Sequence, residues 1–349
     1  MKRLILCADG TWNQADQIDK ETGKRRPTNV TKIARAILPR TTQGINQIVF
    51  YHDGIGTSGG ALDRHTDGAF GHGMEDHIRD LYRFLVFNYV PGDEIYLFGF
   101  SRGAFTVRSL AGFLHCVGLL EKDDDYYTPE LYQLYEKQIA PDSAEWNHAH
   151  RNVKNKRPAP PIHFIGVWDT VGALGAPGLM GQVLNRKKYQ YHRADLNSSI
   201  RRAYHALALD ERRKPFAPTL FTKPAGWIGE LIQAWFSGVH TNIGGGYDPD
   251  GLANEALHWI VKKATAAGIA VDSTYLGHFE PHYNSKLRDS MTLMYYLMGP
   301  IIRPVGDHAI DGERIHVSAQ DRFNDTNCGY TATNLASCLK ESSLPIEPR

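Results

Sequence analysis

A serine between two glycines is the residue whose surroundings point most directly to chemistry. Ser101 is the centre of residues 99–103, Gly-Phe-Ser-Arg-Gly, a G-x-S-x-G motif. The apolar run 94–100 before it indicates a strand, and the apolar run 105–120 after it indicates a helix. A strand, a sharp turn and a helix are the context of a nucleophile elbow, where the helix dipole favours developing negative charge. We predict that Ser101 is the nucleophile of a serine hydrolase. The alternative is an ordinary strand–helix turn with a surface serine.

A serine hydroxyl is a poor nucleophile at neutral pH and needs a general base. His240 follows the predicted strand 232–239, and Asp169 follows the predicted strand 162–168. The order Ser, Asp, His is that of the α/β-hydrolases. We predict that His240 takes the proton of Ser101 and that Asp169 holds the imidazole tautomer and stabilises the imidazolium. The alternatives are a capping aspartate and a structural histidine.

An oxyanion in such a site needs two hydrogen-bond donors. One should be the backbone N–H of Arg102, the residue after the nucleophile, and the other should come from a loop that follows another strand. The turn at residues 9–12 supplies the N–H of Gly10 or Thr11. The alternatives are an ordinary Asp-Gly turn at that place and a donor from the similar turn at residues 53–57.

Metal and cofactor sites have weaker signals. The chain has 16 histidines, and Asp9, Asp53 and Asp248 could converge near the site, but none of these residues has the spacing of metal ligands. The three glycines at 244–246 are not followed by Lys-Ser/Thr, and the chain lacks G-x-G-x-x-G, so they do not indicate a nucleotide loop. We therefore predict no metal ion and no cofactor.

The elements that must position these residues alternate between strands and helices. This alternation predicts an α/β-hydrolase fold, a mostly parallel sheet with helices on both faces, in one domain covering residues 1–349. Ligands of such sheets bind at the carboxyl ends of the strands, where Ser101, Asp169 and His240 are expected. The predicted strands are 3–8, 47–52, 94–100, 162–168, 219–222 and 232–239, and the predicted helices are 29–38, 75–89, 105–120, 201–209 and 252–267.

Two segments are candidates for shaping a substrate pocket. The glycine-rich stretch 54–73 has no periodicity and is long enough to be a functional loop. The polar and aromatic stretch 123–161 is expected to be an insertion or a lid, with helical character near 131–139. Residues after 270 have a mixed pattern that gives no clear elements.

Charge and hydropathy narrow the class of protein. The chain has 349 residues with 39 basic and 38 acidic side chains, so its formal net charge is +1. This balance gives no long-range attraction to nucleic acid, and we expect no nucleic-acid partner. The apolar run at the N-terminus is too short for a signal peptide, and no run approaches the roughly 18 apolar residues of a membrane helix. The four cysteines have scattered positions that fit a reducing compartment. We expect a soluble, cytoplasmic protein without a transmembrane segment.

Six segments, in order along most of the chain, match one family. The sequence resembles the catalytic domain of type VI secretion lipase effectors of the phospholipase type. This resemblance implies an α/β-hydrolase with Ser101, Asp169 and His240 as its triad. In place of the acidic residue that often follows His-Thr in the family, this chain has Asn242. The matching segments are DGTWN at 9–13, YHDGIGT at 51–57, GFSRGAF at 99–105, GVWDTVG at 166–172, HALALDERR at 205–213 and GVHTNIGGGY at 238–247.

The motifs and the resemblance together predict a serine esterase or lipase that works through an acyl-enzyme on Ser101. The resemblance implies a lipid ester as substrate, with phospholipid first. It also implies type VI secretion components or an immunity protein as partners, and export without a signal peptide through that secretion system. Two alternatives remain open: a non-catalytic interaction module that keeps the hydrolase fold, and an acyltransferase that passes the acyl group to an alcohol other than water.

Overall fold

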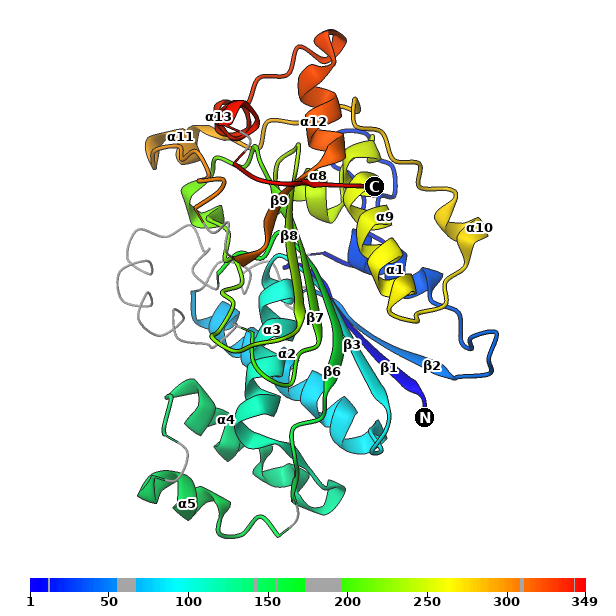
Figure 1. Cartoon of the computed structure of the whole chain (residues 1–349). Coiled ribbons are helices and arrows are strands. Elements are labelled where there is room, and N and C mark those ends of the chain that lie inside the picture. Colours follow the sequence, from blue (N-terminus) through cyan, green and yellow to red (C-terminus); the bar gives the residue numbers. More distant parts are fainter. Residues whose placement is uncertain are drawn as a thin grey trace.

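The computed structural model describes the chain except residues 12, 55–66, 141–142, 155, 173–195, 308–310 and 342, and the side chains of 67–72. Within this described part, eight strands form one sheet in which every pair of neighbours is parallel (Figure 1). The spatial order of the strands is β10-β9-β8-β7-β6-β3-β1-β2. They are β1 (Arg3–Ala8), β2 (Gln47–His52), β3 (Glu94–Phe100), β6 (Ile162–Trp168), β7 (Arg202–Ala208), β8 (Glu230–Phe236), β9 (Glu313–His316) and β10 (Ile346–Glu347).

Helices cover both faces of the sheet because its strands are apolar on both sides. Leu4 and Leu6 of β1 belong to a core with the helices α2 and α3, whereas Ile5 and Cys7 belong to a second core with α1 and α9. Figure 1 shows α2 and α3 on one side of the strands and α1 and α9 on the other. The expected α/β architecture, a mostly parallel sheet with helices on both faces, is confirmed. These helices are α1 (Asn29–Ala36), α2 (Asp67–Asn88), α3 (Arg102–Val117) and α9 (Gly251–Ala266).

The predicted helix at 201–209 is wrong, because these residues form the central strand β7. Residues 203–208 are all buried, between β6 on one side and β8 on the other. A short apolar run that is buried on every side has no periodicity that separates a strand from a helix. Its alanines and leucines favoured the helix in the sequence, and the sheet overrides that preference.

The predicted strand at 219–222 is also wrong, because no strand forms among these described residues. The amide side chain of Gln233 in β8 takes the place of a neighbouring strand. Its Oε1 accepts from Phe221 N at 2.8 Å, and its Nε2 donates to Phe221 O at 3.0 Å. Arg108 donates to Thr219 O and Leu220 O, so this segment bonds largely to side chains rather than to a strand ladder.

The segment 123–161 packs at the end of α3 far from Ser101. It contains α4 (Thr128–Glu136) and α5 (Ala144–His150). The Tyr135 hydroxyl donates to Ser109 O in the middle of α3, and Arg157 donates to Leu120 O, beyond the end of that helix. Figure 1 shows α4 and α5 at the opposite end of the molecule from α8 (His240–Gly244). This placement favours the insertion over the lid.

Residues after 270 contain more regular structure than their sequence predicts. β9 and β10 extend the parallel sheet, and a third core packs against β8 and β9. Because these strands join the same sheet, the tail supports the prediction of one domain. The remaining helices of this part are α10 (Ser273–Leu276), α11 (Leu293–Leu297), α12 (Val317–Asn324) and α13 (Thr333–Glu341).

Most of the segment 54–73 lies outside the described residues, so the functional loop expected there stays a prediction. Its last part is the first turns of α2, which therefore begins before the predicted helix at 75–89. Among the helices that the structure describes, none combines the length and the apolar character needed to cross a bilayer. All four cysteines are free thiols.

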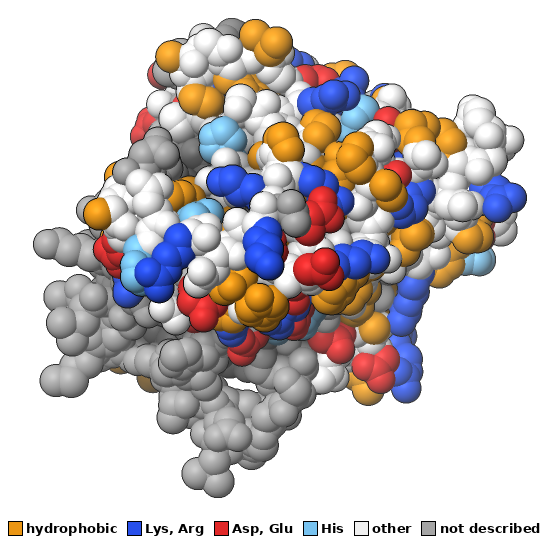
Figure 2. Space-filling model, turned by 90° about the horizontal axis from the view of Figure 1, so that it is seen from below, with side chains coloured by type: hydrophobic (Ala, Val, Ile, Leu, Met, Phe, Trp, Pro, Cys, Tyr) orange, Lys and Arg blue, Asp and Glu red, His pale blue; other side chains and the backbone are white. Residues whose placement is uncertain are grey.

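The face seen from below in Figure 2 carries basic, acidic and apolar side chains that alternate over short distances. Its described residues form no continuous stripe of one charge sign. This pattern follows from 39 basic and 38 acidic side chains spread along the chain. The described residues of this face therefore present charges of mixed sign.

The second glycine of the G-x-S-x-G motif is required by close packing, which gives a test of the fold. A Cβ atom on Gly103 would lie 2.1 Å from the carbonyl oxygen of Ala8, at the end of β1. Alanine gains about 1 kcal/mol over glycine in a helix, but such an overlap costs about 1–3 kcal/mol or more. We expect Gly103→Ala to lower the free energy of unfolding, measured by urea denaturation.

The control is Gly44→Ala, because a Cβ there meets nothing within 4 Å among the described residues and only its positive φ of 82° opposes the substitution. The packing argument requires a larger loss at Gly103 than at Gly44. An equal or smaller loss at Gly103 would contradict it.

Candidate active site

Ser101 sits in a strained turn between β3 and α3. Its φ of 57° and ψ of −123° are rare for a residue with a side chain, and it is the N-cap of α3. The backbone N–H of Ser101 donates to Trp168 O at 3.0 Å, which ties the turn to the end of β6. A Cβ on Gly99 would lie 2.6 Å from the Ala104 Cα atom, so glycine permits the close approach of strand and helix. The expected elbow geometry is therefore present at this serine.

Three side chains from separate parts of the sheet form one row of hydrogen bonds. His240 Nε2 lies 2.8 Å from Ser101 Oγ, and His240 Nδ1 lies 2.6 Å from Asp169 Oδ2. Ser101 follows β3, Asp169 follows β6, and His240 is the first residue of α8, just beyond β8. The sheet thus brings together the three residues that were predicted from the sequence.

Electrostatics at these side chains favour an ionised carboxylate beside a neutral imidazole. Burial alone would raise the pKa of the Asp169 carboxyl, but the charge of Arg303 and the hydrogen bond to His240 hold it well below its usual range. Burial lowers the pKa of the His240 imidazole, although Asp169 acts in the opposite direction. With its Nδ1–H given to Asp169, a neutral imidazole can accept the Ser101 proton at Nε2.

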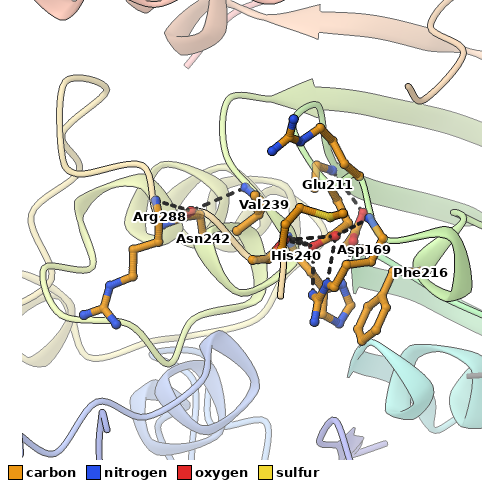
Figure 3. A network of polar contacts seen from close by, with 12 residues as sticks. Asp169, Glu211, Phe216, Val239, His240, Asn242 and Arg288 are labelled. Atoms are coloured by element: carbon orange, nitrogen blue, oxygen red, sulfur yellow. Dashed lines mark hydrogen bonds and ion pairs between the residues drawn. The ribbon is translucent and has the colours of Figure 1, made fainter. Parts of the chain in front are cut away.

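Aromatic rings and a second carboxylate hold His240 in place. Figure 3 shows Asp169, Glu211 and Phe216 gathered around it. The imidazole centroid lies 4.6 Å from the Phe100 ring and 5.0 Å from the Phe216 ring. The backbone N–H of His240 donates to Glu211 Oε2 at 3.2 Å. The imidazole thus packs against two aromatic rings, and the backbone of His240 is anchored.

Glu211 is fully buried and is paired with Arg213. The guanidinium of Arg213 donates to both carboxylate oxygens, at 2.9 and 2.8 Å, and lies over the Phe216 ring. Burial alone would raise the pKa of the Glu211 carboxyl, but Arg213 lowers it below its usual value. A second buried acid–arginine pair therefore faces the histidine.

Asn242, where this chain departs from the family pattern, fixes the turn that carries His240. Its Oδ1 accepts from Val239 N at 3.3 Å and from Arg288 N at 3.4 Å (Figure 3). The amide oxygen accepts both bonds without a charge of its own. The departure therefore preserves the position of the histidine.

The loop after β1 is organised by a buried carboxylate at Asp9. Its Oδ2 accepts from the hydroxyls of Thr28, Thr31 and Tyr51, at 2.6, 3.1 and 2.8 Å. Its Oδ1 accepts from Gly10 N at 2.7 Å. Burial raises the pKa of this carboxyl, which the three hydroxyls oppose. This bonding fixes the backbone next to Ser101.

The two candidate oxyanion loops pack against each other. A Cβ on Gly54 would lie 1.7 Å from Gly10 O, and Gly54 N donates to Asn13 O at 3.0 Å. The N–H groups of Gly10 and Gly54 therefore both donate hydrogen bonds within the protein already. This leaves Thr11 as the candidate in this loop, since residues 55–57 lie outside the described part.

Two of the three carboxylates that could have converged on a metal have other partners. Asp9 is bonded to hydroxyls, and Asp248 is paired with Arg26 and Lys24. In the part of the chain that the structure describes, no group of three or more His, Cys, Asp and Glu side chains is arranged to hold a metal ion.

Sequence reasoning missed Glu211, Phe216 and Arg303. Glu211 lies in the matched segment 205–213, so its position could have been singled out there. Arg303 had no such signal, because it lies in a tail without clear periodicity and is 134 residues from Asp169, which it contacts.

Comparisons with known proteins identify the family. The family model described as "T6SS, Phospholipase effector Tle1-like, catalytic domain" matches residues 2–263. An uncharacterized protein of Saccharomyces cerevisiae, YEL023C, is 30% identical over 253 residues, which are 66% of this chain and 34% of that protein. This chain therefore spans about a third of the yeast protein.

The solved structures that match this chain are more distant in sequence. An uncharacterized protein from Pseudomonas aeruginosa is 16% identical, with a TM-score of 0.44 over 81% of this chain and 49% of its own. The Tle1 effector bound to the VgrG spike of the type VI secretion system is 20% identical, with a TM-score of 0.39 over 71% of this chain and 51% of its own. This chain spans about half of each. On the match over residues 2–263, the chain belongs to the family of type VI secretion phospholipase effector, Tle1-like, catalytic domains.

Proposed function

We propose that the protein is a serine hydrolase that cleaves carboxylic esters of lipids, with phospholipid as the first substrate class. Membership of a phospholipase effector family supports a hydrolase. The observation that carries the proposal is the row of hydrogen bonds from Ser101 Oγ through His240 to Asp169, at 2.8 and 2.6 Å. A nucleophile, a base and an orienting carboxylate in contact are what acyl transfer requires.

In the proposed reaction, Ser101 Oγ attacks the ester carbonyl carbon while His240 Nε2 takes the hydroxyl proton. The carbonyl oxygen becomes an oxyanion that accepts hydrogen bonds from the backbone N–H groups of Arg102 and Thr11. The imidazolium is stabilised by Asp169 and gives its proton to the leaving alcohol as the C–O bond breaks. Water then attacks the acyl-enzyme with His240 as base, which releases the acid and restores Ser101.

Exposed apolar side chains near the site support a lipid substrate. Residues 291–302 carry no charged side chain. Leu293 and Leu297 of α11 are 78% and 82% exposed, although large apolar residues are usually covered. Tyr295 of the same helix lies with its ring centroid 6.3 Å from that of Phe216, which packs on His240. The helix thus reaches the site on one side and offers an apolar surface to lipid on the other.

Family membership also supports partners and a route of export. We propose that the chain is made in the cytoplasm, leaves through a type VI secretion system and is neutralised by an immunity protein. The solved Tle1 effector is bound to a VgrG spike, and a spike protein is the first partner to examine for this chain.

Covalent labelling tests the proposed nucleophile. We expect a fluorophosphonate probe to label the wild-type protein at Ser101, since His240 activates that hydroxyl. Ser101→Ala should remove the label and lower kcat on a short ester by at least about 10⁴-fold, because triad members act as a unit. Mass spectrometry of the labelled peptide checks the position.

Ser109→Ala is the matched control, since this serine of α3 is equally buried and is remote from His240. It should keep the label and the activity. A folded wild-type protein that takes no label would contradict the proposal and favour the non-catalytic module.

Vesicles test the lipid part of the proposal. We expect the double substitution Leu293→Ser/Leu297→Ser to lower hydrolysis of phosphatidylethanolamine vesicles at least about tenfold, since it removes apolar area that would enter the interface. Hydrolysis of a water-soluble short ester should stay within about twofold, because neither side chain contacts the row of hydrogen bonds.

Ile228→Ser provides the control, since Ile228 is 99% exposed and lies in the loop before β8. It should leave both activities unchanged. Equal loss of both activities in the α11 variant, or no loss on vesicles, would count against a lipid surface at this helix.

A further inference from the structure

Arg303 is a buried cation that binds the carboxylate of Asp169 through two hydrogen bonds. Its side chain is 0% exposed. Nη1 donates to Asp169 Oδ1 at 2.6 Å, and Nη2 donates to Asp169 Oδ2 at 3.0 Å. Two parallel bonds of this kind fix the plane of a carboxylate as well as its position. Arg303 lies outside the matched range 2–263.

The remaining donors to Asp169 are few. Ala208 N donates to Oδ1 at 3.0 Å, and His240 Nδ1 to Oδ2 at 2.6 Å. A carboxylate has about four acceptor positions, so these two donors and the two from Arg303 fill them. Half of the bonds that orient Asp169 therefore come from one guanidinium.

The same guanidinium also donates hydrogen bonds to the backbone of residues next to His240. Nη2 donates to Phe216 O at 2.6 Å, and Nη1 donates to Ala208 O at 2.8 Å. The Phe216 ring packs edge-on against the imidazole of His240. Arg303 thus contacts two neighbours of the imidazole without touching the imidazole itself.

The backbone of Arg303 is fixed independently. Pro304 follows it, which keeps residue 303 extended. Asn334 Nδ2 donates to Arg303 O and to Leu209 O, both at 3.2 Å. The tail is therefore tied to the loop after β7 at the place where the arginine enters.

Charge adds a second effect to this geometry. The charged groups that face His240 are Asp169 with Arg303, and Glu211 with Arg213. The charges of the two carboxylates and the two guanidinium groups cancel, so the imidazole lies in a cluster of nearly zero net charge. Removing the Arg303 charge leaves a net negative cluster, and a net negative cluster increases the affinity of the Asp169–His240 pair for a proton.

We propose that Arg303 is a positioning residue of this site, which holds Asp169 and Phe216 in place for His240 and keeps the Asp169–His240 pair from taking up a proton. The proposal rests on the proposed hydrolase function only for its catalytic consequence. The position and proton affinity of His240 are properties that can be measured without turnover.

The test compares Arg303→Met, Arg303→Lys, Asp169→Asn and the double variant Asp169→Asn/Arg303→Met. Arg303→Met should lower kcat on a short ester about 100-fold, as misplaced catalytic groups do, with little change in KM. The acid limb of its pH–rate profile should move to higher pH by about one unit. Arg303→Lys keeps the positive charge but loses the two parallel hydrogen bonds to Asp169. It should therefore lower kcat without moving the acid limb of the pH–rate profile.

The double variant separates positioning from folding, since it removes the whole buried ion pair. It should lose at most a few-fold more activity than Asp169→Asn alone, because Arg303 acts mainly through that carboxylate and only its bond to Phe216 O is lost in addition. Arg322→Met is the matched control, because Arg322 is also buried and donates to carbonyls of Tyr283 and Ser285. It should leave the pH profile unchanged.

A readout without catalysis completes the test. NMR titration of the His240 ring in Ser101→Ala protein should show a higher pKa when Arg303→Met is added. The proposal would be overturned by an unchanged titration of the His240 ring. It would also be overturned if the losses of kcat in Asp169→Asn and Arg303→Met multiplied in the double variant. An inactive wild type with a shifted ring titration would instead refute the hydrolase and leave the positioning role intact.

Discussion

The buried negative charge of Asp169 is the constraint on which the arrangement depends. An ionised carboxylate away from water is costly unless it is fully hydrogen-bonded and paired. Asp169 is 0% exposed, and its donors come from β7, from α8 and from the C-terminal tail. The hydrogen bonds of the Asp169 carboxylate therefore form only when the central strands and the C-terminal tail are folded together. The same assembly presents the His240 imidazole to Ser101.

The sheet explains how residues so far apart in sequence meet. β3 and β6 are neighbours, and β7 separates β6 from β8. Parallel strands end at one edge, so Ser101, Asp169 and the turn before His240 reach a common edge. Two of the three described non-glycine residues with positive φ lie in the turns at that edge: Ser101 at 57° and Asp169 at 37°. Strained residues with side chains persist where their surroundings determine them, and here both lie in the site.

The sequence predicts residues whose role is local and misses those whose role depends on distant packing. Ser101 could be predicted because its strand, turn and helix are contiguous, and the strand–turn contexts of Asp169 and His240 are local too. β7 was read as a helix because its burial on both sides erases periodicity. Arg303 could not be found, since nothing around it in the chain indicates a carboxylate 134 residues away. Glu211 is intermediate, because its segment was recognised but its contact with His240 N needs the fold.

The central claim is that Ser101, His240 and Asp169 act together on an acyl group whose oxygen lies at the start of α3. A crystal structure of the protein inhibited by an alkyl phosphonate tests it most directly. We predict phosphorus bonded to Ser101 Oγ, with one phosphonyl oxygen about 3 Å from the backbone nitrogens of Arg102 and Thr11. An adduct on another residue, or a phosphonyl oxygen that points away from both nitrogens, would contradict this assignment.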